Sequence, residues 1–465
     1  MDESFSATTE LAVPGIGDQM KAAFGKVSIT PPINDVYPDF FFGVPTGVLD
    51  DIYARVAVMN ASDSPAIVVT VDTLGLGVAE IAELEDAITD TTDIPSDRIL
   101  ITSSHSHSAP ILCPVDLYGG FSPYFDGLRD RVTQLVKDLL SRMAPITLSF
   151  GKSRCDFNVN RRRITPEGTC IMAPNPDGVV DKSVPILACH QENGVLAGVF
   201  FSYCCHPTIL LGPKVSGDYP GQAQLALEAR HRESVALYLP GMFANVRPHL
   251  PAANSGFRKG TPGDTMRCGS VLADAVDVAL KGCEQVPVNA IRTWRIHRPL
   301  PLGQPPSRRE LDEILSQAVR SAQATDAEKA KRSSWDGGYQ LAIRQWVQQI
   351  RLEQAENRVP TTVDYTFSRW DIGHVHWIAF SGEFFLEYGL YAQELFGGDR
   401  TFTLGYTQGC QTYVPTAQAL PEGGYEPNAY KRWRQSAPFA PSVEEAVKGA
   451  IRELVNKSEK AFVQP

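Results

Sequence analysis

Short runs of β-branched, aromatic and other apolar residues recur along this 465-residue chain and constrain its fold more than any other feature. Runs of this length and composition, bounded by turn-forming residues, predict buried β-strands. We expect strands at residues 66–72, 99–103, 195–204, 235–239, 374–381 and 401–406. Apolar residues at helical spacing lie between or after them, at 125–143, 221–230, 266–280 and 442–460. Strands that alternate with helices predict an α/β fold, with mixed α+β layers.

One segment, residues 305–358, differs from the rest in composition. It is rich in Glu, Lys, Arg, Gln and Ala and has few β-branched residues, which predicts two or three helices with a break at Trp335 to Gly338. Its apolar residues form a plausible buried stripe, made of Leu341, Ile343, Trp346, Val347 and Ile350. We therefore expect a helical insertion within a single domain that spans residues 1–465.

The composition argues against several classes of protein. Lys and Arg number 43 and Asp and Glu 53, so the net charge is −10, which disfavours general nucleic-acid binding. No run of 18 apolar residues is present, so no membrane span is expected. The first residues lack the basic and apolar regions of a secretory signal, and the nine cysteines show no CxxC pair. These features predict a cytoplasmic protein, although removal of a leader would leave secretion open.

The strongest candidate for a functional motif is Ser-His-Ser-His-Ser at residues 104–108, directly after the predicted strand 99–103. If the strand continues, His105 and His107 point to the same face, because side chains alternate along a strand. Two such histidines are a recurrent metal-binding arrangement, and the small serines leave room for a ligand. A polar strand end with ordinary hydrogen bonds explains the motif equally well.

Three further candidates also come just after predicted strands: His206, Glu383 and Tyr413. Each has a structural explanation when taken alone. Open α/β sheets, however, place their sites beyond the carboxyl ends of their strands. Two imidazoles and a carboxylate form the ligand set of a hydrolytic zinc site. The pattern of residues alone is consistent with a metallohydrolase.

Nine segments, in order along the chain, resemble the N-terminal catalytic domain of the neutral/alkaline non-lysosomal ceramidase family. They are GKVSITPP (25–32), DIYARV (51–56), TSSHSHSAP (102–110), NVNR (158–161), CHPT (205–208), SGDYPG (216–221), IAFSGE (378–383), YVPT (413–416) and EGGYE (422–426). Each match is weak alone, and the ordered set is specific. The resemblance covers most of the chain and implies the fold of that catalytic domain.

The resemblance also implies a set of site residues. In that family a zinc ion is bound by two histidines, a glutamate and a tyrosine, and the matching residues here are His105, His206, Glu383 and Tyr413. The family further places a second histidine, an arginine and a tyrosine around the metal. Their counterparts in this chain are His107, Arg161 and Tyr425. The resemblance therefore implies Zn²⁺ as the cofactor.

The chain departs from the family at one segment of the site. True ceramidases carry Gly-Asp-x-Ser-Pro-Asn there, whereas this chain has ANVRPH at residues 244–249, with Asn245 and Arg247 in place of the Asp and the Ser. A guanidinium suits a carboxylate or phosphate oxygen, so Arg247 favours a small polar or anionic substrate over ceramide. The alternative is that Arg247 points outward to a surface acid. The chain also ends near the family's domain boundary, so we expect no C-terminal immunoglobulin-like domain.

The resemblance implies a zinc-dependent hydrolase of an amide or ester bond. His107 would act as general base or hydrogen-bond donor, Arg161 or Arg247 would stabilise the oxyanion, and Tyr425 would position the substrate. Two alternatives stay open: a lyase, isomerase or ring-opening enzyme with the same site, and a catalytically silent binding protein. The expected partner is a small molecule, and a homo-oligomer is left open.

Overall fold

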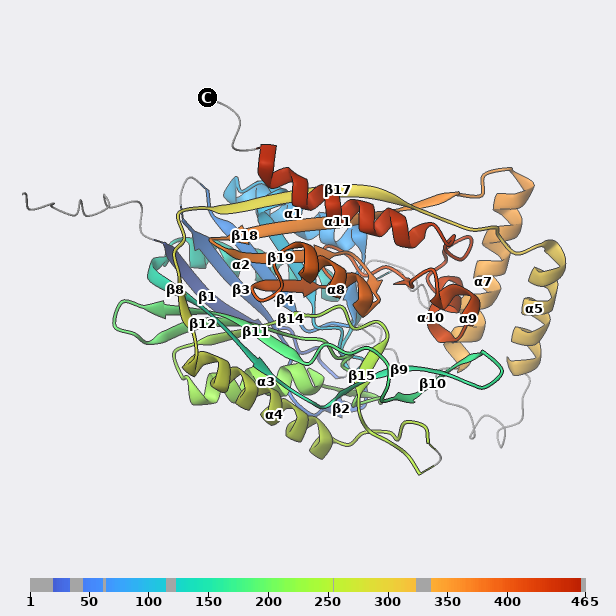
Figure 1. Ribbon diagram of the computed structural model, residues 1–465, viewed down its shortest axis with the longest axis horizontal. Coiled ribbons are helices and arrows are strands. Elements are labelled where there is room, and N and C mark those ends of the chain that lie inside the picture. Colours follow the sequence, from blue (N-terminus) through green and yellow to red (C-terminus); the bar gives the residue numbers. More distant parts are fainter. Residues whose placement is uncertain are drawn as a thin grey trace, which may run out of the picture.

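The largest sheet that the structure describes has nine strands, all of them drawn from the part of the chain that ends at Val286 (Figure 1). The computed structural model describes residues 20–33, 45–61, 64–113, 123–253, 255–322 and 336–460. The strand order is β14-β12-β11-β8-β1-β3-β4-β6, and β16 pairs with β8 beside this path. The strands are β1 (Lys21–Ser28), β3 (Tyr53–Asn60), β4 (Ala66–Val71), β6 (Ile99–Ser103), β8 (Ala144–Arg154), β11 (Ser183–Gln191), β12 (Leu196–Tyr203), β14 (Val235–Pro240) and β16 (Glu284–Val286).

A second sheet of four strands, in the order β17-β18-β19-β21, is built from the C-terminal part of the chain. Its strands are β17 (Ile291–Pro301), β18 (Thr362–Ile372), β19 (Val375–Phe380) and β21 (Thr401–Leu404). Isolated bridges from Thr102 to Thr407 and from Gly241 to Leu404 join the two sheets near the ends of β6, β14 and β21. The ends of strands from distant parts of the sequence therefore meet in one region.

Four small sheets surround this region. One has the order β10-β9-β15, and the other three are the pairs β13-β2, β20-β22 and β5-β7. Their strands are β2 (Gly47–Val48), β5 (Gly75–Leu76), β7 (Ile111–Leu112), β9 (Asn158–Ile164), β10 (Cys170–Asn175), β13 (Lys214–Val215), β15 (Val246–Pro248), β20 (Glu383–Phe384) and β22 (Tyr413–Val414).

Helices cover the outer faces of the sheets (Figure 1). Helices α1 and α2 pack on β3, β4 and β6, α3 and α4 pack on β11, β12 and β14, and α8 and α11 pack on the second sheet. The helices are α1 (Val78–Thr92), α2 (Pro123–Leu140), α3 (Asp218–Arg230), α4 (Pro262–Lys281), α5 (Arg308–Ala322), α7 (Asp336–Ala355), α8 (Leu386–Leu395), α9 (Ala419–Glu422), α10 (Tyr425–Asn428) and α11 (Val443–Lys460). Two short 3₁₀ turns are η1 (Ser96–Arg98) and η2 (Ala429–Lys431).

Side chains alternate between two cores along the strands of the large sheet. In β6, Leu100 belongs to a central core between the sheets, whereas Ile99 and Ile101 pack with α1 and α2. Phe200 of β12 also lies in the central core, and its two neighbours pack with α3 and α4. A strand that is buried on both faces must be apolar throughout, which explains the continuous apolar runs in the sequence.

The structure confirms the mixed α/β class, and the predicted strands are present. Helices α5 and α7 fall within the expected insertion and lie side by side at one end of the molecule (Figure 1). Ile343, Trp346, Val347 and Ile350 are buried in a cluster with residues of α5. The expected break is wrong at its glycines, because α7 begins at Asp336 and includes both; Trp335 and the side chain of Leu341 lie outside the described residues.

Among the helices that the structure describes, none combines the length and the apolar character that a membrane span requires.

Candidate metal centre

His105 and His107 enter the site from a turn. β6 ends at Ser103, and His105 has a φ of 64°, in the left-handed region that L residues other than glycine rarely adopt. The expected reason for a shared face, a continued strand, is therefore wrong. Both imidazoles still reach the same place, and a tertiary contact between His105 Nδ1 and the carbonyl oxygen of Leu74 holds the segment there.

The serines of the motif fasten this turn to its neighbours. Ser106 Oγ donates a hydrogen bond to the carbonyl oxygen of Ser216 at 2.8 Å, and Ser108 Oγ donates one to that of Leu210 at 3.1 Å. Both acceptors belong to the segment that follows His206. The polar residues of the motif thus have two functions: the histidines supply the site, and the serines hold the two histidine-bearing segments together.

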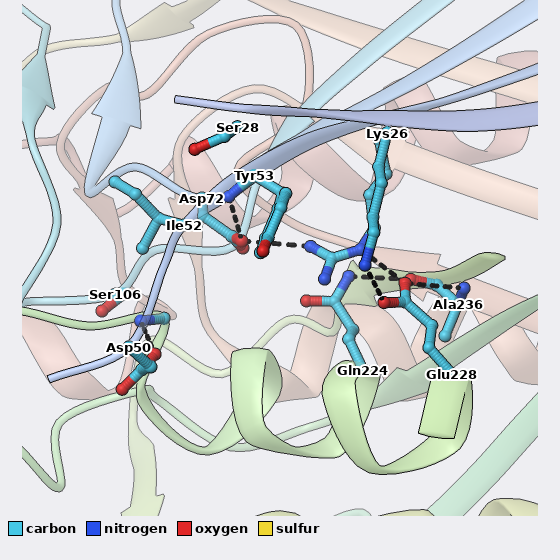
Figure 2. Close-up of polar contacts among 12 residues, drawn as sticks. Lys26, Ser28, Asp50, Ile52, Tyr53, Asp72, Ser106, Gln224, Glu228 and Ala236 are labelled. Atoms are coloured by element: carbon cyan, nitrogen blue, oxygen red, sulfur yellow. Dashed lines mark hydrogen bonds and ion pairs between the residues drawn. The ribbon is translucent and has the colours of Figure 1, made fainter. Parts of the chain in front are cut away.

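A network of ion pairs links the end of β4 to helix α3. Asp72 directly follows β4, and its carboxylate accepts a hydrogen bond from Arg55 Nη1 at 3.1 Å. Arg55 Nε lies 3.0 Å from Glu228 of α3, which also pairs with Lys26 of β1 (Figure 2). The network connects β1 and β3 to α3. Because α3 packs on β12 and β14, these ion pairs fix the position of that part of the large sheet relative to β1 and β3.

Three imidazoles converge in the centre of the site. His105 Nε2 lies 3.0 Å from His206 Nε2, and His107 Nε2 lies 3.1 Å from the same atom. All three side chains are buried. Imidazole nitrogens that bind one zinc ion at 2.0–2.1 Å are roughly 3.3 Å apart in tetrahedral geometry. The spacing of the three nitrogens therefore suits a shared metal ion.

A carboxylate lies beside one of these imidazoles. Glu383 opens β20, is buried, and places Oε2 3.5 Å from His105 Nε2. The same oxygen accepts a hydrogen bond from the hydroxyl of Tyr406 at 3.2 Å, and the Tyr406 ring lies 4.2 Å from the ring of His105. Sequence reasoning placed Tyr406 at the end of a strand and missed this contact. Its only signal was a tyrosine after a glycine at a strand end.

The expected residues Arg161, Tyr413 and Tyr425 lie together beside this group. Arg161 Cζ is 5.5 Å from the centroid of the Tyr413 ring and 5.8 Å from that of Tyr425, and the two rings are 5.5 Å apart. Burial raises the pKa of Tyr413, and the nearby Glu383 carboxylate raises it further. Tyr413 therefore lies close enough to Glu383 to sense its charge, and its hydroxyl is neutral at neutral pH.

Glu426 holds Arg161 in this position. Its Oε1 atom lies 2.8 Å from Arg161 Nε, and its Oε2 atom lies 2.6 Å from Arg162 Nη1. Arg162 also pairs with Glu422 at 3.1 Å. Glu426 was missed as a functional candidate, although it belongs to the EGGYE segment that carries Tyr425. Its ion pair with Arg161 Nε fixes the position of that guanidinium beside the tyrosine rings.

Arg247 is buried, with 7% of its surface exposed. Its Nη2 atom donates to the carbonyl oxygen of Thr208 at 3.3 Å, and its guanidinium lies 4.2 Å from the centroid of the Phe257 ring. Burial lowers the pKa of Arg247 to about 10, and the positive charge of Arg161 contributes to the change. The alternative that Arg247 points outward to a surface acid is therefore wrong.

The electrostatics of the site keep two of its imidazoles, those of His107 and His206, neutral. Burial lowers the pKa of His107 and of His206 well below the usual value for histidine. The other charged or chargeable groups of the site, including Arg161 and Arg247, lower both pKa values further, and Arg432 adds to the effect on His107. Arg432 lies just after η2, and no local motif pointed to it. A neutral imidazole is the form that binds a metal ion.

The chain is similar to known proteins in structure. In sequence it matches no family model and no curated protein. The crystal structure of neutral ceramidase from Pseudomonas aeruginosa aligns with a TM-score of 0.69 and 16% identity, over 96% of this chain and 75% of that one. A structure described as ceramidase complexed with C2 aligns with a TM-score of 0.69 and 17% identity, over 96% and 76%. The chain therefore has the fold of the neutral ceramidases.

Proposed function

We propose that this protein is a zinc-dependent hydrolase that cleaves an amide or ester bond of a small polar or anionic molecule with a metal-activated water. The observation that carries the proposal is the convergence of three buried imidazole Nε2 atoms, with the Glu383 carboxylate 3.5 Å from that of His105, in a neutral ceramidase fold. The proposed ligands are His105, His206, Glu383 and Tyr413.

The residues present fit a zinc ion by their chemistry. Nitrogen from histidine and oxygen from a carboxylate are ordinary zinc ligands. His105 Nδ1 lies 2.6 Å from the carbonyl oxygen of Leu74, and Glu383 accepts from Tyr406. Such outer hydrogen bonds orient metal ligands in known sites. When bound, the zinc ion supplies a Lewis acid and lowers the pKa of a water molecule to about 7.

The remaining residues provide the other functions of a hydrolase. His107 is buried, and its low pKa leaves it unprotonated at neutral pH, the form that a general base requires. Arg161 is held by Glu426 and offers guanidinium N–H groups to a developing oxyanion. Tyr425 lies beside Arg161 and would position the substrate.

Metal analysis combined with a substrate panel tests the proposed function. The purified protein should hold about one zinc ion per chain, and chelation should abolish turnover of amides or esters. His206→Ala should lose both metal and activity. His374→Ala is the matched control, because His374 is exposed and its contact is with Arg400, outside the site.

Product analysis separates the remaining candidates. Arg247 at the position of the ceramidase serine is the observation that favours an elimination, isomerisation or ring opening. Hydrolysis in H₂¹⁸O should place the label in the acid product, whereas elimination or isomerisation should not. A folded, zinc-loaded protein that converts no substrate class would contradict the proposal and support a binding protein. Efficient cleavage of ceramide would contradict the preference for a polar substrate.

A further inference from the structure

Arg247 differs from four other buried arginines in its partners. Arg55, Arg161, Arg162 and Arg369 each form an ion pair with a carboxylate. Within the described ranges, Arg247 forms an ion pair with no carboxylate, and its Nε atom is buried without a hydrogen-bond partner. A buried charge without a counter-ion is costly, so this position can accept an anion at a favourable free energy.

The guanidinium of Arg247 lies next to the imidazole cluster. It donates to the carbonyl oxygen of Thr208, whose own N–H donates to the carbonyl oxygen of His206 at 2.8 Å. The backbone N–H of His107 donates a hydrogen bond at 3.3 Å to the carbonyl oxygen of Pro207, which lies between His206 and Thr208 in the chain. Arg247 and two of the imidazoles therefore border the same three-residue segment.

The remaining donors of Arg247 suit a planar anion. The Phe257 ring lies 4.2 Å from the guanidinium carbon, so it covers one face of the group and leaves the edges for hydrogen bonding. The planar fork of a guanidinium matches the two oxygens of a carboxylate. Arg161 Nη2 is also buried without a hydrogen-bond partner among the described residues, so a second donor is close to the same site.

We infer that Arg247 binds a carboxylate of the substrate, so that the enzyme acts on acidic amides or esters such as N-acylated amino acids. This inference rests on the proposed hydrolase function and adds the substrate class. The carboxylate would pair with the Nε edge of Arg247, and the bond to be cleaved would lie toward the imidazoles. The charge of the substrate would then compensate the unpaired guanidinium.

A pair of matched substrates tests the inference in the zinc-loaded enzyme. N-acetylated amino acids and their primary amides have the same shape and differ in the negative charge. The wild-type kcat/KM should be higher for the acids. Arg247→Gln should lower kcat/KM for the acids by roughly tenfold to a thousandfold and change that for the amides much less. Arg247→Lys should have a kcat/KM for the acids between those of the wild type and of Arg247→Gln. Lysine keeps the positive charge but cannot form the paired hydrogen bonds of a guanidinium.

Arg163→Gln is the matched control. Arg163 lies in the same β-strand as Arg161 and is partly exposed, so its loss removes one positive charge near the site without changing the site. It should keep the preference for the acids. An equal kcat/KM for acids and amides in the wild type, or an unchanged preference in Arg247→Gln, would overturn the inference.

A binding measurement separates this inference from the proposed function. In chelator-treated protein a carboxylate cannot bind through zinc. The N-acetylated acids should still raise the Tm of the wild type and of Arg163→Gln more than the amides do, and this difference should vanish in Arg247→Gln. If it persists in Arg247→Gln, the carboxylate subsite is wrong even where zinc-dependent hydrolysis is present. If the difference in Tm shift vanishes in Arg247→Gln as expected, while no hydrolysis occurs, the carboxylate subsite is supported and the proposed function is wrong.

Discussion

The Nδ1 atom of His105 lies 2.6 Å from the backbone carbonyl oxygen of Leu74. Because a carbonyl oxygen only accepts hydrogen bonds, Nδ1 of His105 is the donor in this contact. The contact turns Nε2 toward His206 and Glu383, whose nearest atoms lie 3.0 Å and 3.5 Å away. A backbone contact from a separate segment thus prepares His105 to bind a metal ion.

The roles of the three histidines can be separated by alanine substitution. His206→Ala should lose the metal, because His206 Nε2 is the atom closest to both other imidazoles. His107→Ala should keep the metal and lose most of kcat, since we assign His107 to proton transfer. Elemental analysis and circular dichroism check both variants. Loss of the metal from a folded His107→Ala protein would make His107 a ligand instead.

Gly382→Ala should weaken the metal site through the backbone. Gly382 has a φ of 93°, and a Cβ there would lie 2.8 Å from the Tyr365 ring, next to Glu383. We expect a loss of about 1–3 kcal/mol in the free energy of unfolding and a lower zinc affinity. Gly397→Ala is the control, because Gly397 has a φ of 84° and open space around it. Equal zinc affinity in both variants would contradict the prediction.

Glu426→Gln should destabilise the protein more than Glu422→Gln. Glu426 is buried and pairs with both Arg161 and Arg162, so neutralising it leaves two buried guanidinium groups poorly compensated. Breaking such a buried pair costs about 3–5 kcal/mol. Glu422 is more exposed and pairs with Arg162 alone, so its neutralisation should cost about 1 kcal/mol or less. Denaturant unfolding measures the difference, and equal losses would argue against the network.

Asp218 should make stability depend on pH. Burial raises the pKa of Asp218 to about 7, and the carboxylate accepts hydrogen bonds from the N–H groups of Leu210 and Tyr219. An unfolded aspartate has a pKa of about 3.9, so between these values the folded protein holds a proton that the unfolded chain releases. Stability should therefore fall by at most a few kcal/mol as pH rises from about 4 to about 7.

Asp218→Asn should remove this part of the pH dependence. Asparagine keeps one side-chain oxygen acceptor and also tolerates the φ of 53° at this position. Unfolding free energies at pH 5 and pH 8 measure the change. Asp156→Asn is the control, because Asp156 is exposed and its ion pairs lower its pKa, so it does not titrate in this range. A wild-type slope retained in Asp218→Asn would exclude Asp218 as its source.

The sequence by itself determined the elements that are buried on both faces. β4, β6, β12, β14 and β19 were predicted nearly to the residue, because a strand between two layers must be apolar along its whole length. β17 and β18 were missed. Their sequences, IRTWRIHRPLP and TVDYTFSRWDI, mix charged and apolar residues, and in β17 neither face is buried along its whole length. The pairing that holds such strands in a sheet is decided by distant segments.

In the candidate site, too, some features could be predicted from the sequence and others depend on tertiary packing. A histidine or glutamate after an apolar strand is visible in the sequence, so His105, His206 and Glu383 were identifiable as candidates. The left-handed turn at His105 and the contact of Tyr406 with Glu383 were decided by the tertiary structure, as was the burial of Arg247 without a carboxylate. The physical reason is that each depends on the packing of segments far apart in the chain, and local residue patterns carry no information about which backbone or charge will lie opposite.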